Sequence, residues 1–396
     1  MIEWGRPDCD RIAPTAAIVG LLTQAASARP EDAALHFKLG LAHIERSDFE
    51  AARRRLEHVL RLDPAAGKAR RGLARCLNRQ RKHEAAVEVL LPVEPGELER
   101  GVALLALGAA EEAERDLRTL LGKNPDDRHA TRHLGKLLRR SGRTDELLEL
   151  CEDLWQRGGR NAQLLYSWGT ALALTGREER ARALLTDPSR VTALELPAPD
   201  SFDGLDEFNR ALAEEILGNP DRRADFPPDE QANRGSERVH SFAAGTRPEL
   251  VRSLVSLLQD LVDKHAPRRA GAFDPWLDAR PARARINAWG LIQRDGNYED
   301  WHLHRGGWLS GVYYLRVPAG IVVDGEGAGC IEFGAPRALA ALRPDLDRRL
   351  RIAPREGLLL LSPSHYAHRT IPMGMPDYRI SFAFDVVPED SIGFRQ

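Results

Sequence analysis

Residues 301–314 read WHLHRGGWLSGVYY, and this stretch decides how the second half of the chain is interpreted. His302 and His304 are separated by one residue, and a Gly-Gly pair and an apolar, aromatic run follow them. If this segment is extended, both imidazoles point to one side, because side chains repeat every two residues along a strand. Two imidazoles on one face supply two corners of a metal site, and His368 in SHYAHRTIP is the candidate for the third. The sequence therefore predicts a site formed by these three histidines.

A fixed cation follows the third histidine in the alternating run YRISFAFDV. Arg379 and Ser381 are two residues apart, so they are expected on the same face of a strand. A guanidinium is always charged and binds a carboxylate through two parallel hydrogen bonds. The hydroxyl groups of Ser381 and Tyr314 can donate further hydrogen bonds. We predict a dicarboxylic acid that meets the metal at one end and Arg379 at the other.

After residue 280 the apolar pattern changes from a helical to an alternating period. Gly, Pro and Asp interrupt it at short intervals, which is typical of an antiparallel sandwich or barrel. Two amphipathic helices, 202–220 and 248–266, precede this region and are expected to pack on one side of the sheet. The predicted strands are 283–294, 308–318, 320–325, 330–334, 356–363 and 378–387.

The first half repeats itself every 34 residues between about 33 and 188, except for one 27-residue step. Each unit carries a small residue at its eighth position, and all but the fourth, which has Leu147, carry one at the twentieth. Small residues at these positions let two helices cross closely. The pattern resembles the tetratricopeptide repeat, a helix-turn-helix unit of about 34 residues. We predict about five units, the third of which (97–125) is shortened. The register positions are Leu39-Gly40, Leu73-Ala74, Gly101, Leu134-Gly135 and Trp168-Gly169.

The composition of the chain disfavours several classes of protein function. The net charge of −2 over 396 residues gives no electrostatic reason to expect binding to nucleic acid or to an anionic membrane. The four cysteines are scattered, which disfavours a disulfide framework and fits a reducing compartment. The first residues lack the apolar core of a signal peptide, and no apolar run approaches about 20 residues. We therefore expect a cytoplasmic protein.

Three segments together, HLHRGGWLSGVYYLRVP, EGLLLLSPSHYAHRTIPM and DYRISFAFDV, resemble iron(II)/2-oxoglutarate-dependent dioxygenases. They are most similar to a bacterial group with the pattern HxH…SGVYYL…H…RIS, and they also resemble prolyl hydroxylases. The resemblance implies that His302 and His368 bind Fe(II). It also implies that Arg379, with Ser381, binds the far carboxylate of 2-oxoglutarate. The implied reaction uses dioxygen, converts 2-oxoglutarate to succinate and hydroxylates an unactivated C–H bond.

His304 departs from the wider superfamily, which has Asp or Glu at the corresponding position. Either it is the third metal ligand, or it supports the ligands or the substrate and leaves a two-histidine site. We favour ligation. Glu299 and Asp300 lie just before the site and are the alternative carboxylate ligands.

These observations predict an α + β protein of two domains, a tetratricopeptide-like α-solenoid followed by a double-stranded β-helix (jelly roll) with flanking helices. The expected bounds are an N-terminal segment 1–32, a repeat domain 33–190 and an oxygenase domain 195–396. The predicted function is a dioxygenase that hydroxylates a peptide or protein recruited by the repeats. The alternatives are a repeat adaptor whose metal barrel is inactive or of cupin type, and repeats that only stabilise the second domain or join it into a homo-oligomer.

Overall fold

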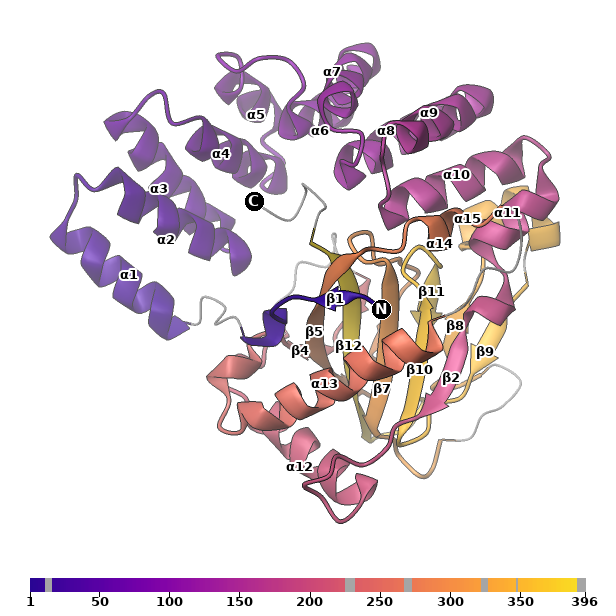
Figure 1. Cartoon of the computed structure of the whole chain (residues 1–396). Coiled ribbons are helices and arrows are strands. Elements are labelled where there is room, and N and C mark those ends of the chain that lie inside the picture. The colour runs from indigo at the N-terminus through magenta and orange to yellow at the C-terminus, as the bar shows by residue number, and fades with distance from the viewer. Residues whose placement is uncertain (11–15, 225–231, 267–272, 322–326, 347, 390–396) are drawn as a thin grey trace. The chain divides into compact units, whose positions relative to one another are not determined.

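The computed structural model describes residues 1–10, 16–224, 232–266, 273–321, 327–346 and 348–389 (Figure 1). The chain divides into two compact units, of which one is Ala13–Gly142. The other combines Met1–Ile12 with Arg143–Gln396. This division falls within the repeats and not at their end. The domain limits drawn from the sequence period stay a prediction.

Helices form the first unit, and they pair as the repeat predicts. α2 and α3 make the first predicted pair, α4 and α5 the second, and α6 and α7 the third. α6 has 9 residues where α2 has 13, which agrees with a shortened third repeat. An additional helix, α1, precedes the first pair within the segment predicted as 1–32. The bounds are α1 Ala16–Ala28, α2 Ala33–Glu45, α3 Phe49–Leu62, α4 Gly67–Arg79, α5 His83–Val89, α6 Leu98–Ala106, α7 Ala110–Lys123 and α8 Arg128–Arg140.

Glycines allow the two helices of a repeat to touch. A Cβ added at Gly40 of α2 would lie 3.1 Å from the side chain of Leu56 in α3. The same distance separates a Cβ at Gly101 of α6 from Leu117 of α7, two helix pairs further on. Both leucines are fully buried and lie sixteen residues after the glycine. The small residue at the eighth position of the period is therefore a steric requirement for the crossing.

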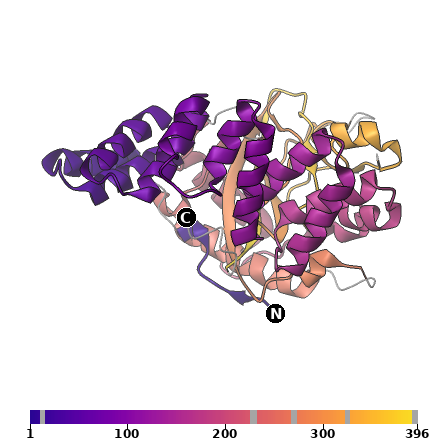
Figure 2. The ribbon, with the colours of Figure 1, turned by 90° about the horizontal axis from the view of Figure 1, so that it is seen from above.

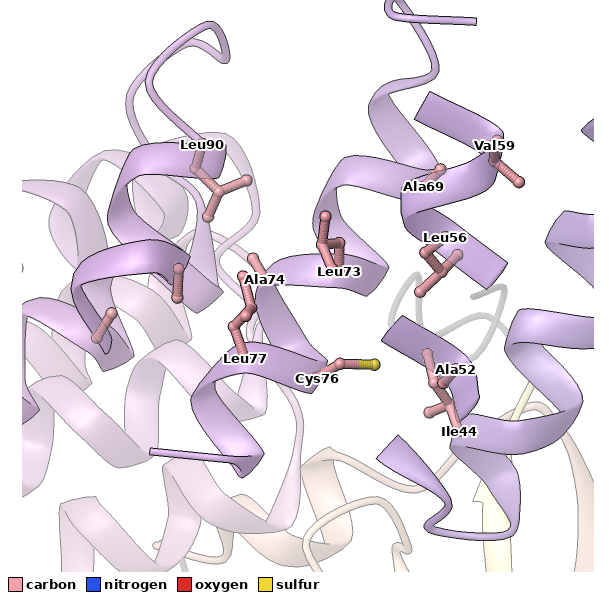
Figure 3. Close-up of a cluster of buried hydrophobic side chains, with 12 residues drawn as sticks. Ile44, Ala52, Leu56, Val59, Ala69, Leu73, Ala74, Cys76, Leu77 and Leu90 are labelled. Atoms are coloured by element: carbon pink, nitrogen blue, oxygen red, sulfur yellow. The ribbon is translucent and has the colours of Figure 1, made fainter. Parts of the chain in front are cut away.

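A continuous apolar core runs between neighbouring repeats. Figure 3 shows part of it, with Leu56 of α3 and Leu73 of α4 on adjacent helices. The cluster also contains Cys76, a buried free thiol. Each repeat thus buries its apolar face against the next one, as expected for a solenoid.

The second unit contains the remaining helices and the strands. α9, α10 and α11 continue the helical hairpins, and two further helices, α12 and α13, correspond to the predicted helices 202–220 and 248–266. None of the helices in the described ranges is long and apolar enough to cross a membrane. The bounds are α9 Thr144–Gln156, α10 Ala162–Leu174, α11 Glu178–Leu185, α12 Leu205–Gly218, α13 Pro248–His265, α14 Pro275–Asp278 and α15 Arg337–Leu342.

Two facing sheets form the jelly roll. The main sheet has the order β1-β5-β12-β7-β10-β2, with β4 also paired to β5, and the smaller sheet has the order β11-β8-β9. Tyr314 of β7 and Phe333 of β8 share one apolar cluster, so the two sheets pack against each other there. The bounds are β1 Glu3–Trp4, β2 Thr192–Glu195, β3 Asn233–Arg234, β4 Glu237–Val239, β5 Arg283–Arg294, β6 Tyr298–Glu299, β7 Leu309–Arg316, β8 Ile331–Phe333, β9 Leu350–Ile352, β10 Leu358–Pro363, β11 His368–Thr370 and β12 Tyr378–Pro388.

Most predicted strands agree with the observed ones. β5, β7, β8, β10 and β12 fall within or within one residue of their predicted ranges. Residues 322–326 of the predicted strand 320–325 lie outside the described residues. α12 packs on one face of the main sheet, where Tyr313 Oη donates a 2.6 Å hydrogen bond to Asn209 Oδ1, which confirms the expected cover. Figure 1 shows α13 on the same side.

Helices α9–α11 are joined to the jelly roll by several contacts. The guanidinium of Arg190, just after α11, forms a buried 2.5 Å ion pair with Asp274. The rings of Trp168 in α10 and Phe273 are 5.5 Å apart. Figures 1 and 2 both show α10 and α11 beside α15, where Arg343 bonds to Glu178 at 2.9 Å. β2, which follows α11, is the edge strand next to β10.

A chain that starts at residue 195 lacks α9–α11 and β2. It should expose one edge of β10 and remove the partners of Asp274 and Phe273. We expect it to aggregate, or to unfold at a lower temperature than a chain that starts at residue 143. Soluble yield and the thermal unfolding midpoint measure the difference. Equal values for the two fragments would mean that these helices are dispensable for the sheet.

Candidate metal centre

Three histidines from two separate segments meet in the jelly roll. The backbone groups of His302 and His368 exchange hydrogen bonds of 3.0 and 2.9 Å, so the segment before β7 is tied to the start of β11. The backbone N–H of His304 donates to Ser364 O at 2.9 Å. One possible ligand atom from each of the three residues lies within 4.8 Å of the others. The structure therefore brings together the three histidines that the sequence singled out.

Hydrogen bonds behind the rings fix their orientation. Nδ1 of His302 lies 2.7 Å from the carbonyl oxygen of Asp300, and Nδ1 of His368 lies 3.1 Å from that of Tyr366. A carbonyl oxygen can only accept, so each Nδ1 carries the proton and each Nε2 keeps its lone pair. The Nε2 atoms of His302 and His304 are 3.2 Å apart. Metal-binding histidines in proteins have this arrangement, with one nitrogen held by an oxygen and the other free.

Burial keeps the rings of His302 and His368 neutral. It is the main reason that the pKa of His302 lies well below its usual value, and the neighbouring imidazoles lower it further. Burial likewise lowers the pKa of His368 to about 3. A neutral imidazole has the lone pair that a divalent transition metal needs. The donor set therefore fits a metal such as iron(II), with three converging nitrogen atoms from two segments.

Asp385, which the sequence analysis did not single out, places its carboxylate next to the ring of His304. Asp385 Oδ1 lies 2.5 Å from Nδ1 of His304 and accepts a 2.6 Å hydrogen bond from Ser310 Oγ. Ser310 in turn is 2.7 Å from Ser364 Oγ. A Cβ at Gly307 would lie 2.5 Å from Ser364 Oγ, so a glycine is needed where the loop after His304 passes this network.

Arg379 lies on the same strand as Asp385 and is 1% exposed. Its guanidinium donates to the carbonyl of Gly329 and to the side-chain oxygen of Gln293, its partner across β5. The Nε atom of Arg379 and the hydroxyl oxygen of Tyr314 are buried without a hydrogen-bond partner within the described residues. Over the same residues, no carboxylate forms an ion pair with Arg379. Arg379 is therefore a buried cation beside hydrogen-bond donors that have no acceptor among the described residues. Such a site fits the carboxylate group of a ligand.

Strand pairing places the other predicted residue beside this cation. Ser381 is opposite Tyr314 of β7, after a register shift at Ile380/Ser381. On β12, alternate residues from Arg379 through Ser381 to Asp385 share one face. Phe382 points the other way and stacks on Phe242, with ring centres 5.3 Å apart. The predicted alternation is thus present in the structure.

The alternative carboxylate ligands have other partners. Glu299 forms a 2.7 Å ion pair with Arg238, and Asp300 forms a 3.2 Å ion pair with Arg234. Among the described residues, neither belongs to the group of side chains that could hold a metal. His365 is buried but also lies outside that group.

Comparison with known families agrees with both resemblances. Residues 287–385 match the family described as "Putative 2OG-Fe(II) oxygenase". Residues 37–91 and 98–154 match the family described as "Tetratricopeptide repeat". The oxygenase-like domain therefore follows the repeats in the chain, as predicted. A search of curated protein sequences finds no matching relative.

Three solved structures illustrate what this chain is partly similar to. A prolyl-4-hydroxylase from Pseudomonas putida has 14% identity and a TM-score of 0.32, and the match covers 50% of this chain and 93% of that one. YrrB, a tetratricopeptide repeat protein with an unusual peptide-binding site, has 21% identity and a TM-score of 0.33, with 42% and 89% covered. PilF from Pseudomonas aeruginosa has 19% identity and a TM-score of 0.35, with 41% and 77% covered.

Replacement of Asp385 by Asn should weaken metal binding without removing a ligand. The amide cannot accept as strongly from His304 Nδ1, and loss of such a supporting carboxylate typically costs about 10–100-fold in metal affinity. Titration of the apoprotein with Co²⁺, followed by its visible spectrum, measures this. Asp377→Asn is the matched control, because Asp377, just before β12, pairs with Arg316 of β7 and, among the described residues, with no histidine. Equal Co²⁺ affinity of the Asp385→Asn variant and the wild type would contradict the role given to Asp385.

Proposed function

We propose that this chain, which joins tetratricopeptide repeats to a 2OG-Fe(II) oxygenase-family domain, is an iron(II)- and 2-oxoglutarate-dependent dioxygenase that hydroxylates a substrate C–H bond. One observation carries the proposal. Three imidazole nitrogen atoms converge in the same jelly roll that buries Arg379 without a carboxylate partner among the described residues. A purely structural metal site would account for the three histidines. It would not account for the buried guanidinium of Arg379, which has no carboxylate partner among the described residues.

In this proposal His302, His304 and His368 bind the metal through Nε2. Three ligands on one side leave positions open for a co-substrate and dioxygen. When bound, iron(II) supplies the activation of dioxygen, which no protein side chain can provide. The residues of this chain hold the rings in place through Asp300 O, Tyr366 O and the Asp385 carboxylate.

The proposed site for 2-oxoglutarate is formed by Arg379, Ser381 and Tyr314. The far carboxylate of the co-substrate would accept hydrogen bonds from the Arg379 guanidinium and the Tyr314 hydroxyl. Leaving a buried polar group without a partner costs about 1–3 kcal/mol, so both atoms favour a ligand that accepts hydrogen bonds. Ser381 lies opposite Tyr314 and can add another donor.

The wider superfamily has an Asp or Glu ligand where this chain has His304, and the His304–Asp385 pair offers an explanation for that difference. A carboxylate ligand would bring one negative charge directly to the metal. Here the Asp385 carboxylate is hydrogen-bonded to His304, and its negative charge would act on a bound metal through that ring. We propose that the pair together takes the role of the carboxylate ligand.

The substrate is proposed to be a peptide or protein side chain, because repeat solenoids commonly bind extended protein segments. A hydrogen bond of 2.9 Å links Gln163 of α10 to Arg305, the residue after His304. A hairpin of the repeat type therefore touches the loop that carries two of the proposed ligands. A cytoplasmic location, absence of nucleic-acid binding and any homo-oligomer stay predictions from the sequence.

Replacement of His302 or His368 by Ala should abolish iron-dependent turnover, since the two remaining rings cannot complete the site. The measurement is succinate release from 2-oxoglutarate with added Fe²⁺, together with the circular dichroism of each variant. His265→Ala in α13 is the control. Retained succinate release in both variants would exclude the oxygenase assignment, and absence of release in the wild type would favour an adaptor with an inactive barrel.

Replacement of Arg379 by Met should remove both the charge and the two-pronged hydrogen bond. Loss of one partner of a buried charge pair costs about 2–5 kcal/mol, so the Kd for 2-oxoglutarate should rise by more than tenfold. Arg379→Lys keeps the charge and should show a smaller loss. Metal affinity should be almost unchanged in both variants, and Arg294→Met, at an exposed end of β5, serves as control. Unaltered 2-oxoglutarate affinity in Arg379→Met would refute this binding mode.

A further inference from the structure

The first helices of the repeat unit line an open cavity of about 390 Å³ that the proposed oxygenase reaction does not use. It lies between the end of α1, the first turn of α2 and one side of α3. A volume of this size lies within the range of ordinary ligand sites, about 300–1,000 Å³. Its polar lining consists of His36, Arg54, Arg55, His58 and Arg61, with Ser27 and the Pro30 loop at one edge.

Every ionisable side chain that lines the cavity is basic. Arg54 is 3.3 Å from Glu50, which offsets part of its charge. Arg55 forms no ion pair with any carboxylate in the described ranges. Arg61 donates a 3.1 Å hydrogen bond to His58 and has no acidic partner within those ranges either. The cavity therefore carries an excess of positive charge.

Its two imidazoles behave differently. His58 is fully engaged, because Nε2 donates to the Pro30 carbonyl at 2.7 Å and Nδ1 accepts from Arg61. His36 packs against it, with ring centres 4.3 Å apart, and is 4% exposed. Neither ring nitrogen of His36 has a hydrogen-bond partner within the described residues. Burial is the main reason that its pKa is lowered, and the charge of Arg55 acts in the same direction.

The sign of the charge excludes a cation as occupant. Two histidines at this distance would otherwise suggest a metal, but both ring nitrogens of His58 are already used and three guanidinium groups surround the cavity. A neutral His36 still offers one N–H donor. An oxygen atom with negative charge would accept from His36 and pair with Arg55 at the same time.

We propose that this cavity binds an oxyanion group, carboxylate or phosphate, of an organic ligand, with His36 and Arg55 as its main contacts. A single inorganic oxyanion is much smaller than the cavity, so the group is expected to be attached to a larger body. The carboxylate of an acidic peptide and the phosphoryl group of a small molecule share the chemistry that the lining recognises. This site is independent of the proposed oxygenase function, because it lies wholly within the Ala13–Gly142 unit.

The test is calorimetric titration of the full chain at constant ionic strength with inorganic phosphate and with an acetylated triglutamate peptide. A triglutamine peptide and chloride are the reference ligands. We expect phosphate or triglutamate to bind, and Arg55→Gln and His36→Phe to weaken that binding about 10–100-fold, the usual effect of losing a charge-assisted hydrogen bond. Binding of triglutamate alone would identify a carboxylate source, and binding of phosphate alone a phosphoryl source.

Lys38→Gln is the matched control. It removes one positive charge from α2, two residues from His36, at an exposed position that does not line the cavity. Thermal unfolding of each variant without ligand verifies that the fold is kept, and a rise of the wild-type midpoint with oxyanion concentration gives a second measurement. The proposal is overturned if neither probe binds better than its reference. It is also overturned if Arg55→Gln and Lys38→Gln bind equally well.

Discussion

The candidate metal centre depends on one constraint, which is that each buried imidazole must place its Nδ1 proton on an oxygen atom. Backbone carbonyls meet this need for His302 and His368, and the Asp385 carboxylate meets it for His304. With each Nδ1 held in this way, one nitrogen of each ring remains as a possible ligand, and such atoms of the three rings lie within 4.8 Å of one another.

β12 connects the two ends of the proposed site. Its inward face carries Arg379 at one end and Asp385 at the other, six residues apart, so a single strand sets the distance between the cation and the ligand support. Its outward face packs Phe382 and Phe384 into the core under η3 (Phe242–Ala244). A shift of one residue in the pairing of this strand would exchange the two faces and place a guanidinium in that core.

The periodic patterns in the sequence were sufficient to predict those features that depend on residues close together along the chain. The spacing of two gave the facing histidines and Arg379-x-Ser381, and the spacing of 34 gave the helical hairpins. Asp385 was not identified, because its role depends on pairing with His304 and Ser310, 81 and 75 residues away. The packing of α9–α11 against the jelly roll was not predicted either, because it also depends on contacts between residues far apart in the sequence. Their repeat pattern describes helix–helix contacts and says nothing about Arg190–Asp274.

The pairing of β1 with β5 has a consequence for the order of folding. Glu3 is synthesised before the Ala13–Gly142 unit, and its partner Arg283 only after it. The hairpins of that unit depend on local contacts and can form during synthesis. The hydrogen bonds of the Ile2 backbone and the Trp4 indole to Asp263 can form only after residue 263 has been made. The Ala13–Gly142 unit is therefore an insertion between two parts of one sheet, and the pairing of β1 with β5 has to span it along the chain.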